Sequence, residues 1–143
     1  MSYKFSLQNV LEWRKDQEDE AKINLIQAKN TLENEQHYLE KLIKENIHLK
    51  EKAALNNRVE AMRQDDLYRK VLNDKIIQQK LIVEQMEHDV KRAEAALLKA
   101  HQDKKVMEKL KEKEEQEYYD EVEAIEQKNL DEFATMTFGR QAY

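Results

Sequence analysis

The sequence contains no cysteine, no proline and a single glycine, Gly139. The lack of cysteine excludes a disulfide framework and a thiol nucleophile. Long apolar runs are also missing, because no stretch approaches the ~20 apolar residues that cross a bilayer. The N-terminus lacks the uninterrupted apolar run of a signal peptide. We therefore expect a soluble cytoplasmic protein that does not insert into a membrane.

What the sequence has in abundance is charge. Charged residues make up 38% of the 143 residues, yet the net charge is only −5. Glu, Lys, Leu, Ala and Gln dominate, as is typical of a coiled coil. Disorder is the alternative, but the net charge is small and the apolar residues recur at regular intervals. The acidic balance argues against nucleic acid as a partner, because phosphate binding needs a clustered positive surface.

Apolar residues follow a heptad pattern in two long segments. The first segment is predicted to be a helix over residues 6–56, with Ser6 as its N-terminal cap. Its seam positions are Leu7, Leu11, Arg14, Glu18, Ala21, Leu25, Ala28, Leu32, Glu35, Leu39, Leu42, Asn46, Leu49 and Ala53. The second helix is predicted over residues 66–136, and its seam positions are Leu72, Ile76, Gln79, Val83, Met86, Val90, Ala93, Leu97, Ala100, Lys104 and Met107.

Between the two segments the pattern lapses, and polar, turn-prone residues predict a bend over 57–65. After Met107 the apolar spacing becomes irregular, and Gly139 is expected to stop the second helix before a short tail over 137–143. The fold class predicted is all-α: a single domain over 1–143, folded as a long two-helix antiparallel coiled-coil hairpin. The second helix is the longer one and overhangs the first.

The register of the hairpin can be predicted from its seam charges. If Leu39 faces Val83, then Glu18 faces Lys104. A lone charge in a seam is costly, whereas a facing opposite pair is tolerated and fixes the alignment. This pairing favours an antiparallel hairpin over a parallel homodimer. It also leaves residues 122–143 without a helix to pair with, an overhang of roughly 30 Å, and an apolar stripe there should be covered by a partner.

No motif for catalysis or for a bound cofactor is found. The four histidines show no metal-ligand spacing, and there is no phosphate-binding loop or nucleophile elbow. We expect no enzymatic activity, no cofactor and no metal. Residues 114–132 carry nine acidic side chains and only Lys128 as a base. The default interpretation is a solvated helix face, and the functional one is a charged surface that orients the overhang on a partner.

Four blocks of the C-terminal half resemble the FliJ family of flagellar export proteins. They are Glu108-Lys109-Leu110-Lys111-Glu112-Lys113, Glu117-Tyr118, Glu126-Gln127-Lys128 and Leu130-Asp131-Glu132-Phe133-Ala134. The opening Phe5-Ser6-Leu7-Gln8-Asn9-Val10-Leu11 and the stretch with Tyr68, Leu72 and Ile76 also fit, so the resemblance covers essentially the whole chain.

The resemblance implies a soluble component of the flagellar type III export apparatus, at the cytoplasmic base of the flagellum. Its implied partners are the export ATPase, the membrane export gate and export chaperones. The residues implied for ATPase contact are Phe5, Leu7, Val10, Arg14, Tyr118, Val122, Lys128, Asp131, Glu132, Phe133 and Arg140. Those implied for gate contact are Leu42, Leu49, Tyr68 and Leu72.

Two other functions remain open at this point. One is a generic coiled-coil scaffold that acts as a homodimer, whereas the hairpin is expected to be a monomer in isolation. The other is a helical binder of RNA or of a membrane surface, against which the acidic balance argues.

Overall fold

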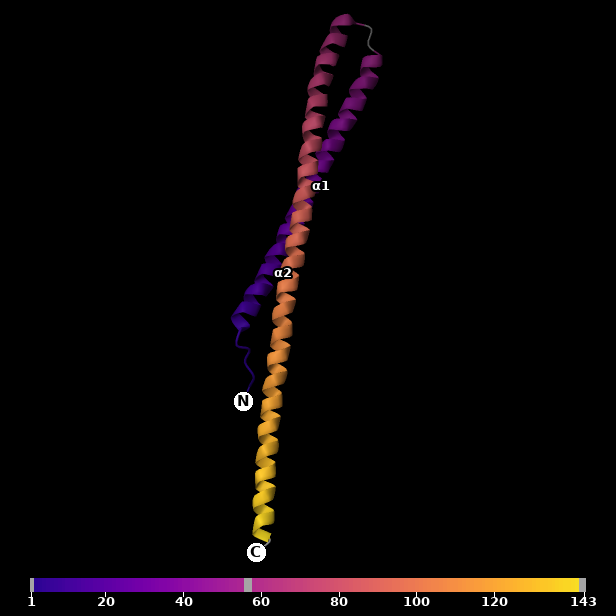
Figure 1. Ribbon diagram of the computed structural model, residues 1–143. Helices are drawn as coiled ribbons and strands as arrows, with labels where there is room; N and C mark the ends of the chain where they lie inside the picture. The colour runs from indigo at the N-terminus through magenta and orange to yellow at the C-terminus, as the bar shows by residue number, and fades with distance from the viewer. Residues whose placement is uncertain (1, 56–57, 142–143) are drawn as a thin grey trace. The chain divides into compact units, whose positions relative to one another are not determined.

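The computed structural model describes residues 2–55 and 58–141, without the side chains of Arg140 and Gln141. It contains two helices, α1 (Gln8–Ala54) and α2 (Val59–Gln141), and the described residues include no strand. The two helices pack against each other and α2 is the longer (Figure 1). The predicted all-α fold of two long packed helices is therefore confirmed.

By its contacts the chain divides into two units. Unit 1 contains residues 1–18 and 100–143, and unit 2 contains residues 19–99. In each unit the partners across the helix pair run antiparallel: Ser6 reaches Glu114 and Arg14 reaches Asp103 in unit 1, while Glu35 reaches Gln79 in unit 2. The single domain over 1–143 stays a prediction.

The bend is shorter than predicted. Leu55 is a turn residue and α2 already begins at Val59, so the stretch up to residue 65 is helical rather than bent. Neither proline nor glycine interrupts it, and Glu60 in the first turn complements the positive end of the helix dipole. Asn56 and Asn57, the most turn-prone pair, lie outside the described residues.

The helix ends also differ from the prediction. α1 begins at Gln8 rather than at residue 6, because Ser6 does not cap it: its amide and its hydroxyl both donate to the Glu114 carboxylate. α2 continues beyond residue 136 through Gly139, which has no positive φ. A glycine that keeps helical geometry costs about 1 kcal/mol relative to alanine but does not end the helix.

The heptad seam is found as predicted. Every predicted seam position in α2 and in α1 is buried or half-buried; Leu7, just before α1, is exposed. In unit 2 the best-packed part of this seam is a cluster of Leu42, Leu72 and Ile76, against which Leu39 and Leu49 pack.

The register of unit 2 differs from the prediction. Gln79 reaches Glu35 and Tyr68 reaches Glu45, both about eight residues nearer to the start of α2 than the predicted register places them. Asn46 reaches Asn73, which is about three residues nearer. α2 also begins earlier than predicted, at Val59, so the shift in unit 2 has the same direction.

Candidate functional site

The N-terminal segment, residues 2–7, lies against α2 as non-helical chain within unit 1. The Tyr3 hydroxyl donates to the carbonyl oxygen of Lys111 at 3.5 Å, and the Ser6 hydroxyl donates to Glu114 at 2.9 Å. The Tyr3 ring also packs on the Tyr118 ring, with centroids 5.5 Å apart. Burial of Phe5 adds an apolar anchor, since only 7% of its surface is exposed.

The seam of α2 continues under this segment without a change of phase. Lys111, Glu114 and Tyr118 follow Lys104 and Met107 at heptad spacing, and all five are half-buried. The apolar spacing becomes irregular after Met107 because α2 is covered there by the N-terminal segment and no longer by α1. The same face of α2 remains in contact. Polar seam positions suit a segment whose own backbone amide and hydroxyl groups need hydrogen-bond partners.

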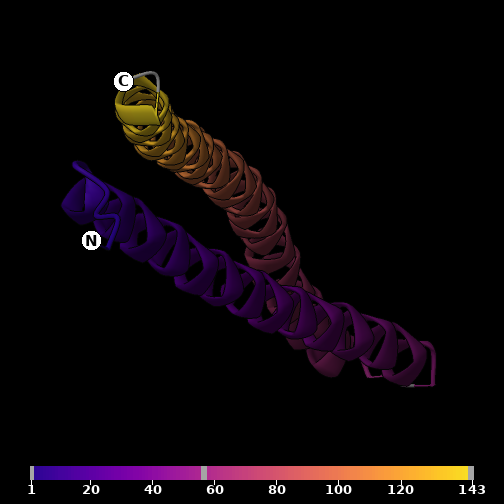
Figure 2. The same cartoon turned by 90° about the horizontal axis from the view of Figure 1, so that it is seen from below.

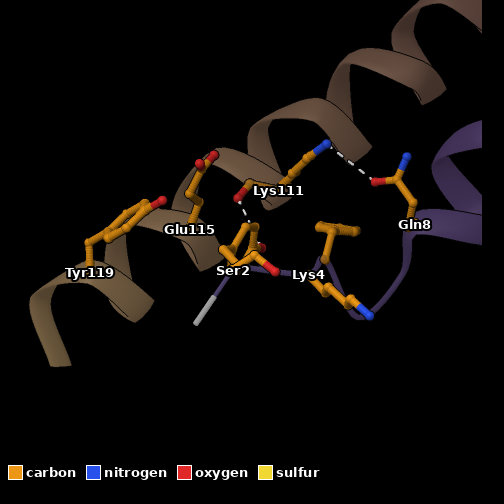
Figure 3. Close-up of a pocket in the computed structure, with 8 residues that line it drawn as sticks. Ser2, Lys4, Gln8, Lys111, Glu115 and Tyr119 are labelled. Atoms are coloured by element: carbon orange, nitrogen blue, oxygen red, sulfur yellow. Dashed lines mark hydrogen bonds between the residues drawn. The ribbon is translucent and has the colours of Figure 1, made fainter. Parts of the chain in front are cut away.

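An open groove of about 650 Å³ lies between the N-terminal segment and α2. In Figure 3 the Lys111 ammonium and the Gln8 amide oxygen point toward one another, and the hydrogen bond between them is 3.2 Å long. Glu115 and Tyr119 extend from the next turns of α2 on the same side. Partial burial, together with the negative charge of Glu114 and Glu115, raises the pKa of the Tyr3 hydroxyl above 10.0. Tyr3 therefore stays a neutral donor at physiological pH.

Next to the segment, α1 and α2 meet in a charged cluster. Lys104 Nζ lies 2.9 Å from Glu18 Oε2, and His101 Nδ1 lies 3.3 Å from the same oxygen. One helical turn toward the start of α1, Arg14 pairs with Asp103 at 3.1 Å and lies over the Trp13 ring at 4.9 Å from its centroid. The predicted register pair Glu18–Lys104 is thus observed directly.

Beyond the N-terminal segment, α2 is bare. We call residues 123–139 the terminal stretch; each of its side chains is exposed. Figure 1 shows these last turns of α2, in yellow, continuing past the N-terminal segment of the same unit, and Figure 2 shows the same helix from below. The apolar side chains that are at least 60% exposed there are Ile125, Leu130, Phe133, Met136 and Phe138. Solvent-exposed apolar side chains in such density are typical of a surface that binds another protein.

Two further kinds of site, a metal-ion site and a membrane span, are not found in the described part of the chain. It holds no group of three or more His, Cys, Asp or Glu residues placed to bind a metal ion. Neither helix contains, over the same residues, an apolar stretch able to span a membrane.

Comparison with known proteins agrees with the resemblance seen in the sequence. The sequence profile described as "Flagellar FliJ protein" matches residues 3–143. The chain belongs to the FliJ family. No curated protein sequence matches it. Among solved structures, a YscO homologue from Chlamydia trachomatis is similar in fold, with a TM-score of 0.65 and 22% sequence identity over 94% of each chain.

The residues that the FliJ resemblance implies for ATPase contact all belong to unit 1. They differ in how accessible they are. Lys128, Asp131, Glu132 and Phe133 are exposed on the terminal stretch, and Leu7 and Val10 are exposed on the first turn of α1 and just before it. Tyr118 and Val122 are half-buried, Arg14 is paired with Asp103, and Phe5 is buried. The Arg140 side chain lies outside the described residues.

The residues implied for gate contact come together in unit 2, but mostly inside it. Leu42 and Leu72 are buried in the seam and Leu49 packs against them, so their side chains stabilise the helix pair. Tyr68 alone is exposed, and its hydroxyl donates to Glu45 at 2.7 Å. That hydrogen bond and the charge of Glu45 raise the pKa of Tyr68 above 10.0. Exposed neighbours that the sequence reasoning did not select are Ile43, Ile47 and Ile77.

Proposed function

We propose that this chain is a non-enzymatic component of the flagellar type III export apparatus and that it binds the export ATPase through unit 1. Membership of the FliJ family supports the assignment to the apparatus. The observation that carries the binding proposal is the terminal stretch, which is exposed on every side and has large apolar side chains such as Phe133, 69% exposed. A helix of this kind is suited to insertion into a surrounding protein.

The mechanism is binding without covalent chemistry. In this proposal the terminal stretch enters the ring of the ATPase, and the adjoining N-terminal segment and first turn of α1 contact its rim. Because an inserted helix contacts several subunits at once, it favours the assembled ring and thereby promotes ATP hydrolysis. The chain would work in the cytoplasm, peripherally associated with the flagellar base.

Unit 2 is proposed to contact the membrane export gate and export chaperones. Of the residues first selected for the gate, Tyr68 has an accessible side chain. The exposed isoleucines Ile43, Ile47 and Ile77 are better candidates than Leu42 and Leu72, because a buried side chain contributes to a partner only if the helix pair opens.

The test is ATP hydrolysis by the cognate export ATPase, measured alone, with the full chain and with a 1–121 truncation. Stimulation by the full chain and not by the truncation is expected. A point variant in the terminal stretch, Leu130→Ser, should also weaken the stimulation, and its matched control is Leu81→Ser in unit 2, whose side chain is equally exposed. If neither the full chain nor the truncation binds or stimulates the ATPase, the proposal is wrong.

A further inference from the structure

The apolar residues at the end of α2, from Val122 to Met136, form a stripe whose period differs from that of the heptad seam. Val83, Val90 and Leu97 recur every seven residues, which suits a left-handed pair of helices. In contrast, Val122 and Phe133 are eleven residues apart, and so are Ile125 and Met136. An eleven-residue repeat follows a straight or slightly right-handed path. The stripe is therefore not matched to a second helix wound around α2 in the left-handed sense.

The charges around this stripe have one sign. Residues 120–139 contain six acidic side chains and one basic side chain, Lys128. At 100° per residue, Asp120 and Asp131 lie on the side opposite Val122 and Phe133, while the remaining acids flank or interrupt the stripe.

These acids have no positive partner in the described part of the chain. Asp120 and Asp131 accept hydrogen bonds from Gln116 and Gln127, and none of the six acids forms an ion pair with a lysine or arginine there. All six are exposed and so are available to a basic partner.

We infer that the terminal stretch docks on a protein surface that has an apolar floor and a rim of lysine and arginine side chains. This inference rests on the proposed function, in which that surface belongs to the export ATPase, and adds the chemistry of the contact. The acidic flanks exclude phosphate-rich nucleic acid and anionic lipid as occupants, because both would be repelled. In the inferred contact, the acidic side chains on each side of the stripe face the lysine and arginine side chains of the partner.

A second copy of this chain is a poorer occupant. Its terminal stretch is equally acidic, and the eleven-residue spacing does not suit a left-handed pair. The lysine-rich stretch 104–113 is a weaker receptor, because three of its five lysines already bind within the chain: Lys104 to Glu18, Lys105 to Glu108 and Lys111 to Gln8.

Charge and apolar contacts should act on different rates. Charges at the edge of an interface accelerate encounter and are screened by salt, whereas a desolvated aromatic side chain slows dissociation. The two contributions can be separated by variants that change one and keep the other.

The experiment measures association and dissociation rates with purified export ATPase at low and high salt. The charge variant is Glu121→Gln, Glu123→Gln and Glu132→Gln together, three acids that flank the stripe; the apolar variant is Phe133→Ala. A matched charge control is Asp74→Asn, Glu84→Gln and Glu87→Gln, three equally exposed acids of unit 2. We expect the charge variant to associate about 10-fold more slowly at low salt and to lose most of its salt dependence. Phe133→Ala should dissociate about 10-fold faster with its salt dependence unchanged, and the control should match the wild type.

The outcomes separate this inference from the proposed function. If the wild type binds the ATPase but neither salt nor the charge variant alters association, the basic rim is refuted while the proposed function stands. If the wild type does not bind at any salt concentration, the proposed function fails and this inference with it. A low-salt dimer of the chain that the charge variant abolishes would identify a second copy as the occupant and overturn the inference.

Discussion

Lys104 and Glu18 face each other across unit 1 with 2.9 Å between Nζ and Oε2. The Glu18 side chain is only 5% exposed and that of Lys104 is 19% exposed, so this ion pair is largely withdrawn from water. A buried charge whose partner is removed is costly, while the intact pair contributes little net stability. The pair therefore helps to fix the register, because an alignment that separates the two residues removes Lys104 from the buried Glu18 carboxylate.

Glu18→Lys alone should destabilise the fold by about 3–5 kcal/mol, because it places two ammonium groups in the same seam. Lys104→Glu should have a similar cost for the mirror-image reason. The double variant restores an opposite pair. It should therefore lose less stability than the two single variants lose in sum, and the difference, the coupling energy, should be at least about 1 kcal/mol. Urea denaturation followed by circular dichroism measures all four proteins.

The matched control is Glu20→Lys, which makes the same charge change at an exposed position of α1. It should alter stability by less than about 0.5 kcal/mol. Strict additivity of the two seam substitutions would mean that the pair does not fix the register.

The success of the seam prediction has a simple physical origin. A long helix pair buries one narrow stripe on each helix, so the spacing of Leu11, Ala21 or Val83 alone identifies the contact face. Even Glu18 and Gln79, polar but buried, were placed correctly, because position in the repeat decides burial in such a structure. The partner of each residue is harder to predict: moving the helix pair by one heptad keeps every seam residue inside. That freedom explains why Gln79 reaches Glu35, about seven residues from the partner that the predicted register gives it.

The N-terminal segment could not be predicted from periodicity. Tyr3 and Ser6 bond to Lys111 and Glu114, partners 108 residues away in the sequence, and no local spacing encodes such contacts. One signal was available: Lys111, Glu114 and Tyr118 continue the heptad of Lys104 although two of them are charged. Charged residues at seam positions indicate that the facing chain is something other than an apolar helix.

Phe5→Ala should release the N-terminal segment while leaving the helix pair intact. Phe5 is the buried apolar anchor of that segment, and loss of a buried phenylalanine costs about 3–5 kcal/mol in a closed core. A segment docked on a single helix can yield more easily, so about 2 kcal/mol is expected. Amide hydrogen exchange should become faster in residues 2–7 and remain unchanged in the unit 2 seam. Faster exchange around Leu72 as well would show that the segment is coupled to the whole fold.

Leu72→Ala should destabilise the protein by about 2–4 kcal/mol, because Leu72 is 3% exposed in the cluster with Leu42 and Ile76. Leu67→Ala removes the same atoms from a side chain that is 64% exposed and should cost less than about 0.5 kcal/mol. Thermal unfolding of the two variants and of the wild type measures both losses of stability. Equal losses would mean that the buried cluster does not dominate the stability of unit 2.

Tyr68 should titrate above its ordinary pKa of 10.0, because the neutral hydroxyl donates to the Glu45 carboxylate and the ionised one would be repelled by it. The folded protein therefore binds this proton more tightly than the unfolded chain does. The stabilisation of the fold by the Tyr68–Glu45 hydrogen bond is fully present below pH 10 and is lost as the pH rises through the folded-state pKa. Glu45→Gln should lower the pKa of Tyr68 toward the ordinary value. Ultraviolet titration of tyrosinate in the two proteins measures the difference, and superimposable curves would contradict the hydrogen bond.

The chain should be a monomer in isolation, of 17.2 kDa by light scattering. Its seam residues are already covered from within: α1 packs on α2 in unit 2 through Leu42, Leu72 and Ile76, and Glu18 finds its counter-charge in unit 1. A parallel homodimer would have to break these contacts and would face like charges at Glu18, because the same residue meets itself. The exposed terminal stretch is acidic and repels its own copy, most strongly at low salt.

A stable dimer of ~34 kDa at every salt concentration, twice the chain mass, would contradict the intramolecular pairing and favour the homodimeric scaffold.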